Sequence, residues 1–408
     1  MKPKASSGKR GMKSKTSRQK IKNKAAKMKI TILCTYFYPY GETRQNINQT
    51  YLASSAPELA RYLTKRGHEV VVISRQVPGT KSLSESTGVK IIRVPFSDRK
   101  GLRLISWHRN ARKALRKSEA EKQSSAILCW DWSTTLPALG LGPKGRRAPV
   151  LCSVRNSSEA WRNKGRKSFR VYKSFESKAF NGSDLVVYSS NWVKQTVDSV
   201  IVVKSPSVVL HHGVDTSMFS PKVSGSKIRK RYGLKPLVVG FFGRLDPVKG
   251  IDSLVEACSN LKTPFTLFLV GNGPQRQSLE EKCARLIPGK FAFAGFQERK
   301  RIPEFMAACD IIALPSLEEG FSSVVVEALA MGKPFIGTKV GGVPEVINGK
   351  NGIKISPGDT ESLRRAIESL SSTAKRREMG KLARETAKRY SWKNVVKEWE
   401  ALLLGASS

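Results

Sequence analysis

The sequence predicts an α/β protein made of two doubly wound domains with parallel sheets. Apolar runs of strand length alternate with segments of helical spacing along most of the chain. The runs are apolar throughout, which is typical of strands buried on both faces of a parallel sheet. The pattern occurs twice, and 408 residues are too many for one ordinary core, so two domains are expected.

The first half contains six expected strands and one clear helix. The helix covers 50–66, and Gly67 follows it as a C-terminal stop. The strands are apolar runs over 30–38, 69–74, 89–94, 125–130, 149–154 and 184–189.

The second half repeats this pattern after a division near residues 205–225. Its expected strands cover 236–243, 265–271, 291–295, 310–315 and 334–338, and its expected helices cover 250–261, 274–286, 302–309 and about 323–331. Ligands of such sheets bind at the carboxyl ends of the strands. The loops that follow these strands are therefore the first place to look for a site.

The net charge of +41 is unusual. Residues 1–29 carry 12 Lys or Arg and no acid, but the rest of the chain is also positive. Such a charge attracts nucleic acid, anionic lipid or phosphorylated substrates without choosing among them. Residues 1–27 lack the apolar residues of a core and are expected to form a disordered basic tail, before the strand pattern that begins at Met28.

The composition argues against secretion and against a membrane span. The six cysteines are scattered without a CxxC pair, which predicts reduced, buried thiols rather than disulfides or zinc ligands. No window approaches the ~18 uninterrupted apolar residues of a membrane span. Nothing resembles a secretory signal, so a cytoplasmic location is expected.

One strand-end loop carries two cations. In GFFGRLDPVKG (240–250) the strand ends at Gly243, Arg244 and Lys249 follow, and a helix begins near Gly250. An Arg fork, a mobile Lys and a helix N-terminus all suit a diphosphate. The alternative is an ordinary turn with two solvated cations.

Another strand-end loop carries two carboxylates. In PSLEEGFSSVVVEALAMGKP (315–334), Glu319 lies in the loop, Ser322 or Ser323 can cap the next helix, and Glu327 lies about one turn inside it. Glu327 could accept hydrogen bonds from a ribose, or could simply be a carboxylate that the helix dipole stabilises near the N-terminus. Glycine-rich loops at 270–274 and 337–345 follow two more strands, and the four loops together predict a nucleotide-diphosphate pocket.

These motifs, in this order, resemble glycosyltransferase family 4, the retaining glycosyltransferases of the GT-B fold. The resemblance rests on GHEVVVIS (67–74), HHGVDTSMFSP (211–221), the two loops above, LVGNGPQRQSLEE (269–281) and YSWKNVVKEWEALL (390–403). It implies an acceptor-binding domain over 28–205, a nucleotide-sugar-binding domain over 206–385, and a final helix in 386–408 that crosses back to the first domain.

The resemblance also implies roles for single residues. The catalytic set would be Glu319, which faces the donor sugar, with Arg244 and Lys249, which hold the diphosphate. Donor binding would further involve Gly243, Gly273, the backbone around Phe321, Ser322, Ser323 and Val324, and Glu327, which grips the ribose. No Asp-x-Asp is present, and the implied activity is a metal-independent, hexosyltransferase-type transfer in which the nucleotide sugar is a co-substrate and no cofactor takes part.

The first half departs from the family. The loop after the first strand (38–46) has a single glycine, Gly41, where relatives often have a pair. Trp130 stands where relatives usually have a histidine, and Asp131 is retained. These residues are expected on the acceptor side, where Trp130 either stacks on the acceptor or is an ordinary core aromatic.

Two basic segments of the first half are amphipathic, 103–117 and 167–180. They either pack on the sheet or rest on an anionic bilayer, which would suit a lipid-linked acceptor and a peripheral position at the cytoplasmic membrane face. The favoured function is a retaining glycosyltransferase acting on a glycan or lipid-linked acceptor. The alternatives are a catalytically impaired nucleotide-sugar-binding protein, a sugar-nucleotide epimerase and, without a motif to support it, a nucleic-acid-binding protein.

Overall fold

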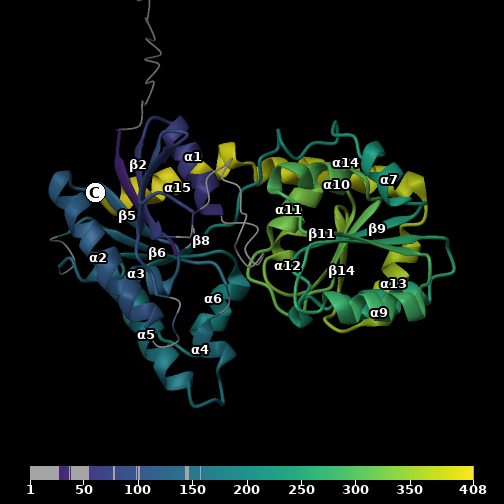
Figure 1. Ribbon diagram of the computed structural model, residues 1–408, viewed down its shortest axis with the longest axis horizontal. Coiled ribbons are helices and arrows are strands. Elements are labelled where there is room, and N and C mark those ends of the chain that lie inside the picture. The colour runs from purple at the N-terminus through teal and green to yellow at the C-terminus, as the bar shows by residue number, and fades with distance from the viewer. Residues whose placement is uncertain are drawn as a thin grey trace, which may run out of the picture.

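The computed structural model describes residues 27–35, 37, 55–76, 79–97, 99, 102–142, 147–156 and 158–407. It contains two domains that lie side by side, each built on a mainly parallel sheet (Figure 1). The expected α/β class is confirmed. The expected basic tail, apart from Lys27, and the loop that holds Gly41 lie outside the described residues.

The first sheet has the strand order β3-β4-β2-β1-β5-β6-β7-β8. Only β3 is antiparallel to its neighbour, and the turn to β4 passes through Thr87 and Gly88, which both have positive φ, as tight hairpins require. The last strand lies beyond residue 205, where the first domain was expected to end. The strands are β1 (Lys29–Leu33), β2 (Glu69–Arg75), β3 (Leu83–Ser86), β4 (Val89–Val94), β5 (Ala126–Cys129), β6 (Val150–Val154), β7 (Leu185–Tyr188) and β8 (Ser207–Val209).

The second sheet is parallel throughout, with the order β11-β10-β9-β12-β13-β14. Four of its six strands are fully buried, as their unbroken apolar sequences predict. The strands are β9 (Val238–Phe242), β10 (Thr266–Val270), β11 (Phe291–Gly295), β12 (Ile311–Leu314), β13 (Phe335–Thr338) and β14 (Gly352–Ile355).

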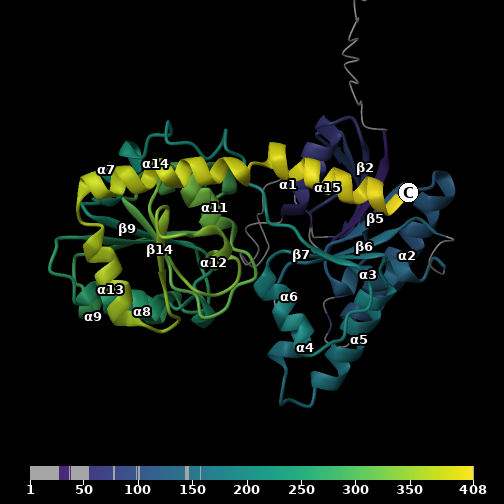
Figure 2. The ribbon, with the colours of Figure 1, turned by 180° about the vertical axis from the view of Figure 1, so that it is seen from behind.

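Helices cover both faces of each sheet (Figures 1 and 2). In the first domain, Ile30 and Ile32 pack with α1 and with the last helix of the chain, α15 (Trp392–Ser407), while Leu33 packs with α2 on the opposite face. The helices of this domain are α1 (Ser55–Lys65), α2 (Arg103–Glu121), α3 (Trp132–Leu139), α4 (Glu159–Arg162), α5 (Phe169–Gly182) and α6 (Asn191–Asp198).

The second domain adds α7 (Ser226–Tyr232), α8 (Ile251–Ser259), α9 (Arg276–Leu286), α10 (Ile302–Ala307), α11 (Ser323–Ala330), α12 (Val343–Val346), α13 (Thr360–Ser369) and α14 (Thr373–Arg389). Short 3-10 helices cover Pro247–Lys249 and Arg299–Arg301. All six cysteines are buried, as expected, and none of them forms a disulfide bond.

The last helix, α15 (Trp392–Ser407), crosses back to the first domain, as Figure 2 shows. Its Trp392, Trp399 and Leu403 are buried in the same core as Ile30 of β1. Its Glu400 accepts a 2.9 Å hydrogen bond from Arg66 Nε and pairs with His68 at 2.6 Å. The expected return of the C-terminal helix is therefore confirmed, and it fixes the first domain to the end of the second.

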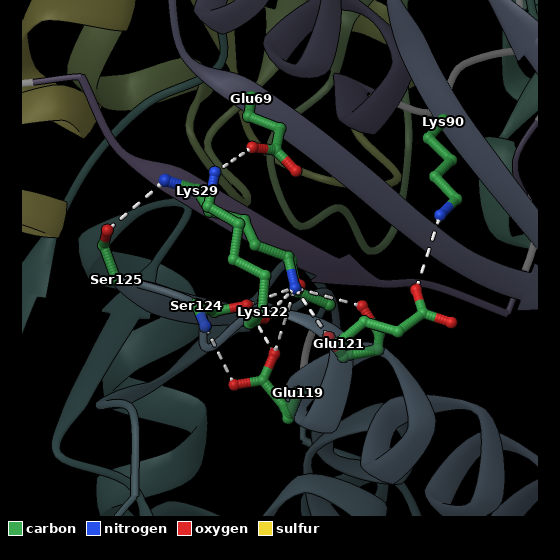
Figure 3. Close-up of polar contacts among 10 residues, drawn as sticks. Lys29, Glu69, Lys90, Glu119, Glu121, Lys122, Ser124 and Ser125 are labelled. Atoms are coloured by element: carbon green, nitrogen blue, oxygen red, sulfur yellow. Dashed lines mark hydrogen bonds and ion pairs between the residues drawn. The ribbon is translucent and has the colours of Figure 1, made fainter.

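Figure 3 shows how the amino edge of the first sheet is secured. Lys29 is buried at the start of β1, and its Nζ donates to Ser118 O at 2.8 Å and to Lys122 O. These carbonyls belong to the C-terminal end of α2, where a cation is favourable. Burial lowers the pKa of Lys29 below its ordinary value. This polar cluster is structural, because the ligand edge of a parallel sheet is the opposite, carboxyl edge.

Candidate functional site

The two loops singled out in the second half lie against each other. Strands β9 and β12 are hydrogen-bonded neighbours, so the loops after them leave the same edge of the sheet. Leu317 N donates to Val248 O at 2.8 Å and ties one loop to the other. A β-carbon at Gly250 would lie 2.1 Å from Pro315 O, so this close approach requires glycine there.

Lys249 and Glu319 form an ion pair between these loops. Lys249 Nζ donates to Glu319 Oε1 at 2.5 Å, and Ser316 Oγ donates to the same oxygen at 3.2 Å. The Glu319 side chain is 10% exposed and that of Lys249 is 22% exposed. The pair is thus held in place but reachable from solvent.

Arg244 lies in the same loop and is less restrained. Its side chain is 44% exposed, and its Nη2 lies 3.3 Å from Asp246 Oδ2. Asp246 also caps the 3-10 helix at 247–249 by accepting from Val248 N. Arg244 can therefore turn toward an anion without breaking a buried contact.

Glycines let a third loop approach the first one. Gly243 has φ 154°, and a β-carbon at Gly271 would lie 1.8 Å from Gly243 O. A β-carbon at Gly273 would lie 2.3 Å from Leu245 O, and Leu245 N donates to Asn272 O at 3.0 Å. The structure therefore brings the loops of Gly243 and Gly273 into backbone contact on both sides of Arg244, through Gly271 with Gly243 and Gly273 with Leu245.

The N-terminus of α11 faces the same edge. Ser322 occupies the N-cap position without a side-chain hydrogen bond to the first turn, so its hydroxyl does not satisfy the amides of Ser323 and Val324. Glu327 lies deeper: its side chain is 4% exposed, and Oε1 accepts from Arg299 Nη1 at 2.7 Å. Its role toward a ribose stays a prediction.

Phe321 connects the loop after β12, residues 315–322, to the linker between the domains. Its ring stacks on His212, with centroids 5.2 Å apart and an interplanar angle of 11°. Burial, together with the nearby Arg155 and His211, lowers the pKa of His212 well below its ordinary value, so the ring is neutral at pH 7. The His212 Nε2 atom is buried without a hydrogen-bond partner among the described residues.

Glu345 of α12 joins the two domains. It pairs with His211 Nε2 at 2.8 Å and accepts from Asn191 N, at the start of α6 in the first domain, also at 2.8 Å. Burial opposes ionisation of Glu345, but these hydrogen bonds outweigh it and hold its pKa below the ordinary value. Ser190 Oγ, beside Asn191, donates to Gly320 O at 3.1 Å. The loop after β12 thus contacts the first domain directly.

The residues expected on the acceptor side have structural contacts. Asp131 is the N-cap of α3 and accepts from Thr134 N at 2.9 Å. Trp130 stacks on Trp399 of α15, with centroids 6.2 Å apart, and Arg155 lies over its ring at 5.0 Å. Stacking of Trp130 on an acceptor stays a prediction, and Gly41 lies outside the described residues.

Four residues near this region were not expected from sequence: Arg155, His212, Arg299 and Glu345. Arg299 comes from the loop after β11 and reaches Glu327 only through tertiary folding. Arg155 carries a signal that could have been used, because it follows the buried strand β6 directly. In a parallel sheet, a cation at that position faces the ligand edge.

Two protein-family models match the chain in succession. "Glycosyltransferase Family 4" matches residues 53–218, and "Glycosyl transferases group 1" matches residues 226–386. The chain belongs to this glycosyltransferase family. Its two domains and returning helix are the GT-B fold, which solved glycosyltransferase structures share.

Curated relatives and solved structures cover nearly all of this glycosyltransferase. An uncharacterized glycosyltransferase of Methanocaldococcus jannaschii is 27% identical over 85% of this chain and 92% of its own length. A GDP-mannose-dependent α-(1-6)-phosphatidylinositol monomannoside mannosyltransferase of Mycolicibacterium smegmatis is 27% identical over 80% of this chain and 86% of its own length.

Among solved structures, sucrose-phosphate synthase of Thermosynechococcus elongatus has a TM-score of 0.79 at 21% identity, over 94% of this chain and 100% of that one. Anabaena HepE in complex with UDP-glucose has a TM-score of 0.73 at 22% identity, over 93% and 100%.

Proposed function

We propose that this glycosyltransferase transfers a hexose from a nucleotide-diphosphate sugar to a glycan or lipid-linked acceptor and retains the anomeric configuration. The observation that carries the proposal is the Lys249–Glu319 pair beside Arg244, at the carboxyl ends of β9 and β12. It combines cations for a diphosphate with a carboxylate that can hold sugar hydroxyls.

Each side chain has a proposed task. Arg244 and Lys249 bind the diphosphate and stabilise the negative charge that develops on it as the glycosidic bond breaks. The first-turn amides of α11 add hydrogen-bond donors at a helix N-terminus. Glu319 orients the sugar, and Glu327 holds the ribose. Because the leaving diphosphate is stabilised by these cations, we assign neither a metal ion nor a carboxylate nucleophile to the reaction.

A panel of UDP, GDP and ADP sugars tests the proposal. The protein is incubated with each donor, with and without acceptor glycans or lipid-linked sugars, and released nucleoside diphosphate is measured. Transfer should yield a product with the donor's anomeric configuration, read from the NMR coupling of the anomeric proton. Nucleotide-sugar binding without transfer or hydrolysis on any acceptor would favour the catalytically impaired binding protein instead.

We further propose that the acceptor is presented at a membrane. The name of the M. smegmatis relative specifies a phosphatidylinositol-linked acceptor. None of the described helices is both long and apolar enough to cross a bilayer. Attachment would therefore involve the surface of the first domain, and the two amphipathic segments supply candidates for it.

The structure separates the packed part of these segments from the exposed part. Trp107, Ala111 and Leu115 of α2 are buried against the sheet, as ordinary packing predicts. At the same helix, however, Leu104 is 42% exposed and Ile105 is 63% exposed. A groove of about 640 Å³ between α2, α3 and α5 is lined by Leu104, Ile105, His108, Arg109, Arg112, Lys113, Arg116, Ser133, Leu136 and Phe175.

This mixture of exposed apolar side chains and cations suits an anionic lipid surface, where each Lys or Arg contributes about 1 kcal/mol. Vesicle sedimentation tests it: binding should require anionic lipid and fall steeply from low to physiological salt. Replacement of Arg109, Arg112, Lys113 and Arg116 by Gln should weaken binding. Failure to sediment with anionic vesicles at low salt would remove the membrane proposal and leave a soluble acceptor.

A further inference from the structure

Arg155 is a buried guanidinium at the carboxyl end of β6. Arg155 is 9% exposed, and its guanidinium carbon lies over the Trp130 ring, 5.0 Å from the ring centroid. Nη1 donates to Ser153 Oγ at 3.2 Å, and Nη2 donates to Ser55 Oγ, in the first turn of α1, at 3.4 Å. Nε is buried and has no hydrogen-bond partner among the described residues.

No carboxylate in the described part of the chain forms an ion pair with Arg155. Burial alone lowers its pKa to about 9, which reflects how strongly the surroundings oppose its charge. Two serine hydroxyls at long distance and the face of the Trp130 ring compensate a buried cation only in part. A buried charge without a counter-ion is costly and is usually retained for binding rather than for stability.

Arg147, in the same domain, shows how a structural arginine is satisfied. Its side chain is 4% exposed, and Nη1 donates to Asp184 Oδ2 at 2.6 Å. Nη2 also donates to Gly182 O at 3.1 Å. Arg147 lies just before β6 and Arg155 just after it, so the paired arginine is at the amino edge of the sheet and the unpaired one is at the carboxyl edge.

The carboxyl edge of β6 meets the loop after β12, which carries Glu319 and is called the donor loop here after its proposed task. A β-carbon at Gly320 would lie 2.2 Å from Arg155 O, so the residue next to Glu319 is in backbone contact with Arg155. His212, which is close enough to Arg155 for the cation to lower its pKa, stacks on Phe321 of that loop. The backbone of Arg155 therefore lies against the loop that carries Glu319, and its cation lies near His212, which stacks on the same loop.

We propose that Arg155 binds an anionic group of a sugar substrate, a carboxylate or a phosphate, between the first domain and the donor loop. The inference rests on the proposed function, because it takes the Glu319 loop as the sugar-binding side. The anion could belong to the donor, as in a nucleotide-linked uronic acid, or to the acceptor, as in a sugar phosphate. An Arg fork suits both groups, and the low-dielectric surroundings strengthen the pair.

The experiment compares the full-length wild type with Arg155→Met and Arg155→Lys, and uses Arg147→Met as the matched buried control. Without ligand, Arg155→Met should melt at the wild-type temperature or above it, because it removes an uncompensated charge. Arg147→Met should melt lower, because it leaves Asp184 unpaired. This difference does not depend on activity.

Binding is then measured by calorimetry in two arms. The donor arm compares UDP-glucuronate with UDP-glucose, and repeats the pair with GDP-linked sugars. The acceptor arm compares glucose 6-phosphate with glucose, with and without saturating UDP. In one arm the wild type should bind the charged sugar about ten- to a hundredfold more tightly than the neutral one, and Arg155→Met should lose that preference. Arg155→Lys should retain part of it.

The outcomes separate the two proposals. Equal binding of charged and neutral sugars by the wild type in both arms, or an unchanged preference in Arg155→Met, overturns the Arg155 site. Failure of every nucleoside diphosphate to bind overturns the proposed function, and the sugar-phosphate arm without UDP still tests Arg155. A melting temperature of Arg155→Met well below that of the wild type would indicate a structural arginine and also count against the proposal.

Discussion

Replacement of Lys249 by Met should weaken the binding of nucleoside diphosphates by about a hundredfold. A charge-assisted hydrogen bond contributes about 1.5–3 kcal/mol, and each 1.4 kcal/mol is about a factor of ten in Kd. The upper part of this range is expected, because the substitution also leaves Glu319, which is 10% exposed, with no partner among the described residues except Ser316, whose hydrogen bond is 3.2 Å long. An unneutralised carboxylate then lies next to the place proposed for the diphosphate, and like charges repel there.

The double variant Lys249→Met/Glu319→Gln sharpens this prediction. Removing the carboxylate as well should recover about tenfold of the lost affinity, so the two substitutions should be clearly non-additive. Titration calorimetry with UDP, GDP and ADP measures Kd for the wild type, both single variants and the double variant.

Lys282→Met is the matched control. Lys282 is also ion-paired, to Asp252 and Glu256, but it lies on α9 rather than in the loops after β9 and β12. A Kd for Lys249→Met within twofold of the wild type, or additive effects in the cycle, would refute the assignment of this pair to the diphosphate.

Three further predictions concern the ribose, acid stability and the N-terminus. Glu327→Ala should abolish the preference for a ribonucleoside diphosphate over its 2′-deoxy analogue, and an unchanged preference in calorimetry would remove Glu327 from the ribose site. Burial opposes ionisation of Asp215, but hydrogen bonds from Ser217, Met218 and Arg61 hold its pKa at about 2. A carboxylate whose pKa is lowered in the folded state stabilises the protein at every pH above its ordinary, unfolded-state pKa, and this stabilisation is lost as the pH falls from about 4 to 2. In urea unfolding, Asp215→Asn should therefore lower the free energy of unfolding by about 2 kcal/mol more at pH 6 than at pH 2. A protein that begins at Met28 should keep the wild-type melting temperature, because the buried Met28 side chain and the core it joins are retained; a fall of many degrees would show that the preceding residues pack.

The sequence predicted the buried strands well because a buried parallel strand must be apolar on both faces. The expected 236–243 contains the fully buried β9, and the expected 310–315 contains the fully buried β12. The missed strands do not meet this condition. In β3 no side chain is buried, β8 has only three residues, and β14 has only two buried residues. All three lie at the outer edges of their sheets, where a strand has one partner and its sequence is less constrained.

The same physical reason separates the site residues that were anticipated from those that were not. Lys249 and Glu319 follow strands that are neighbours in the sheet, so strand order brings them together. Arg299 meets Glu327 from a third loop, and Trp399 meets Trp130 from the final helix. Their pairing depends on tertiary packing, which no local pattern encodes. Trp130 in particular could not be assigned from sequence, because its neighbours Arg155 and Trp399 come from two distant segments.

The loop that carries Glu319, together with Glu345 of α12, also forms the contact between the domains. Gly320 accepts from Ser190 Oγ of the first domain, Phe321 stacks on His212 of the linker, and Glu345 accepts from Asn191 while pairing with His211. A substrate that displaces any of these residues must change the contact between the domains, because each one serves both purposes. Conversely, the relative position of the domains decides whether Arg155 lies next to the Glu319 loop, because its carbonyl is packed against Gly320. Binding of the donor by the second domain and recognition of an anion by the first should therefore be energetically coupled, and by linkage each should tighten or weaken the other by the same factor.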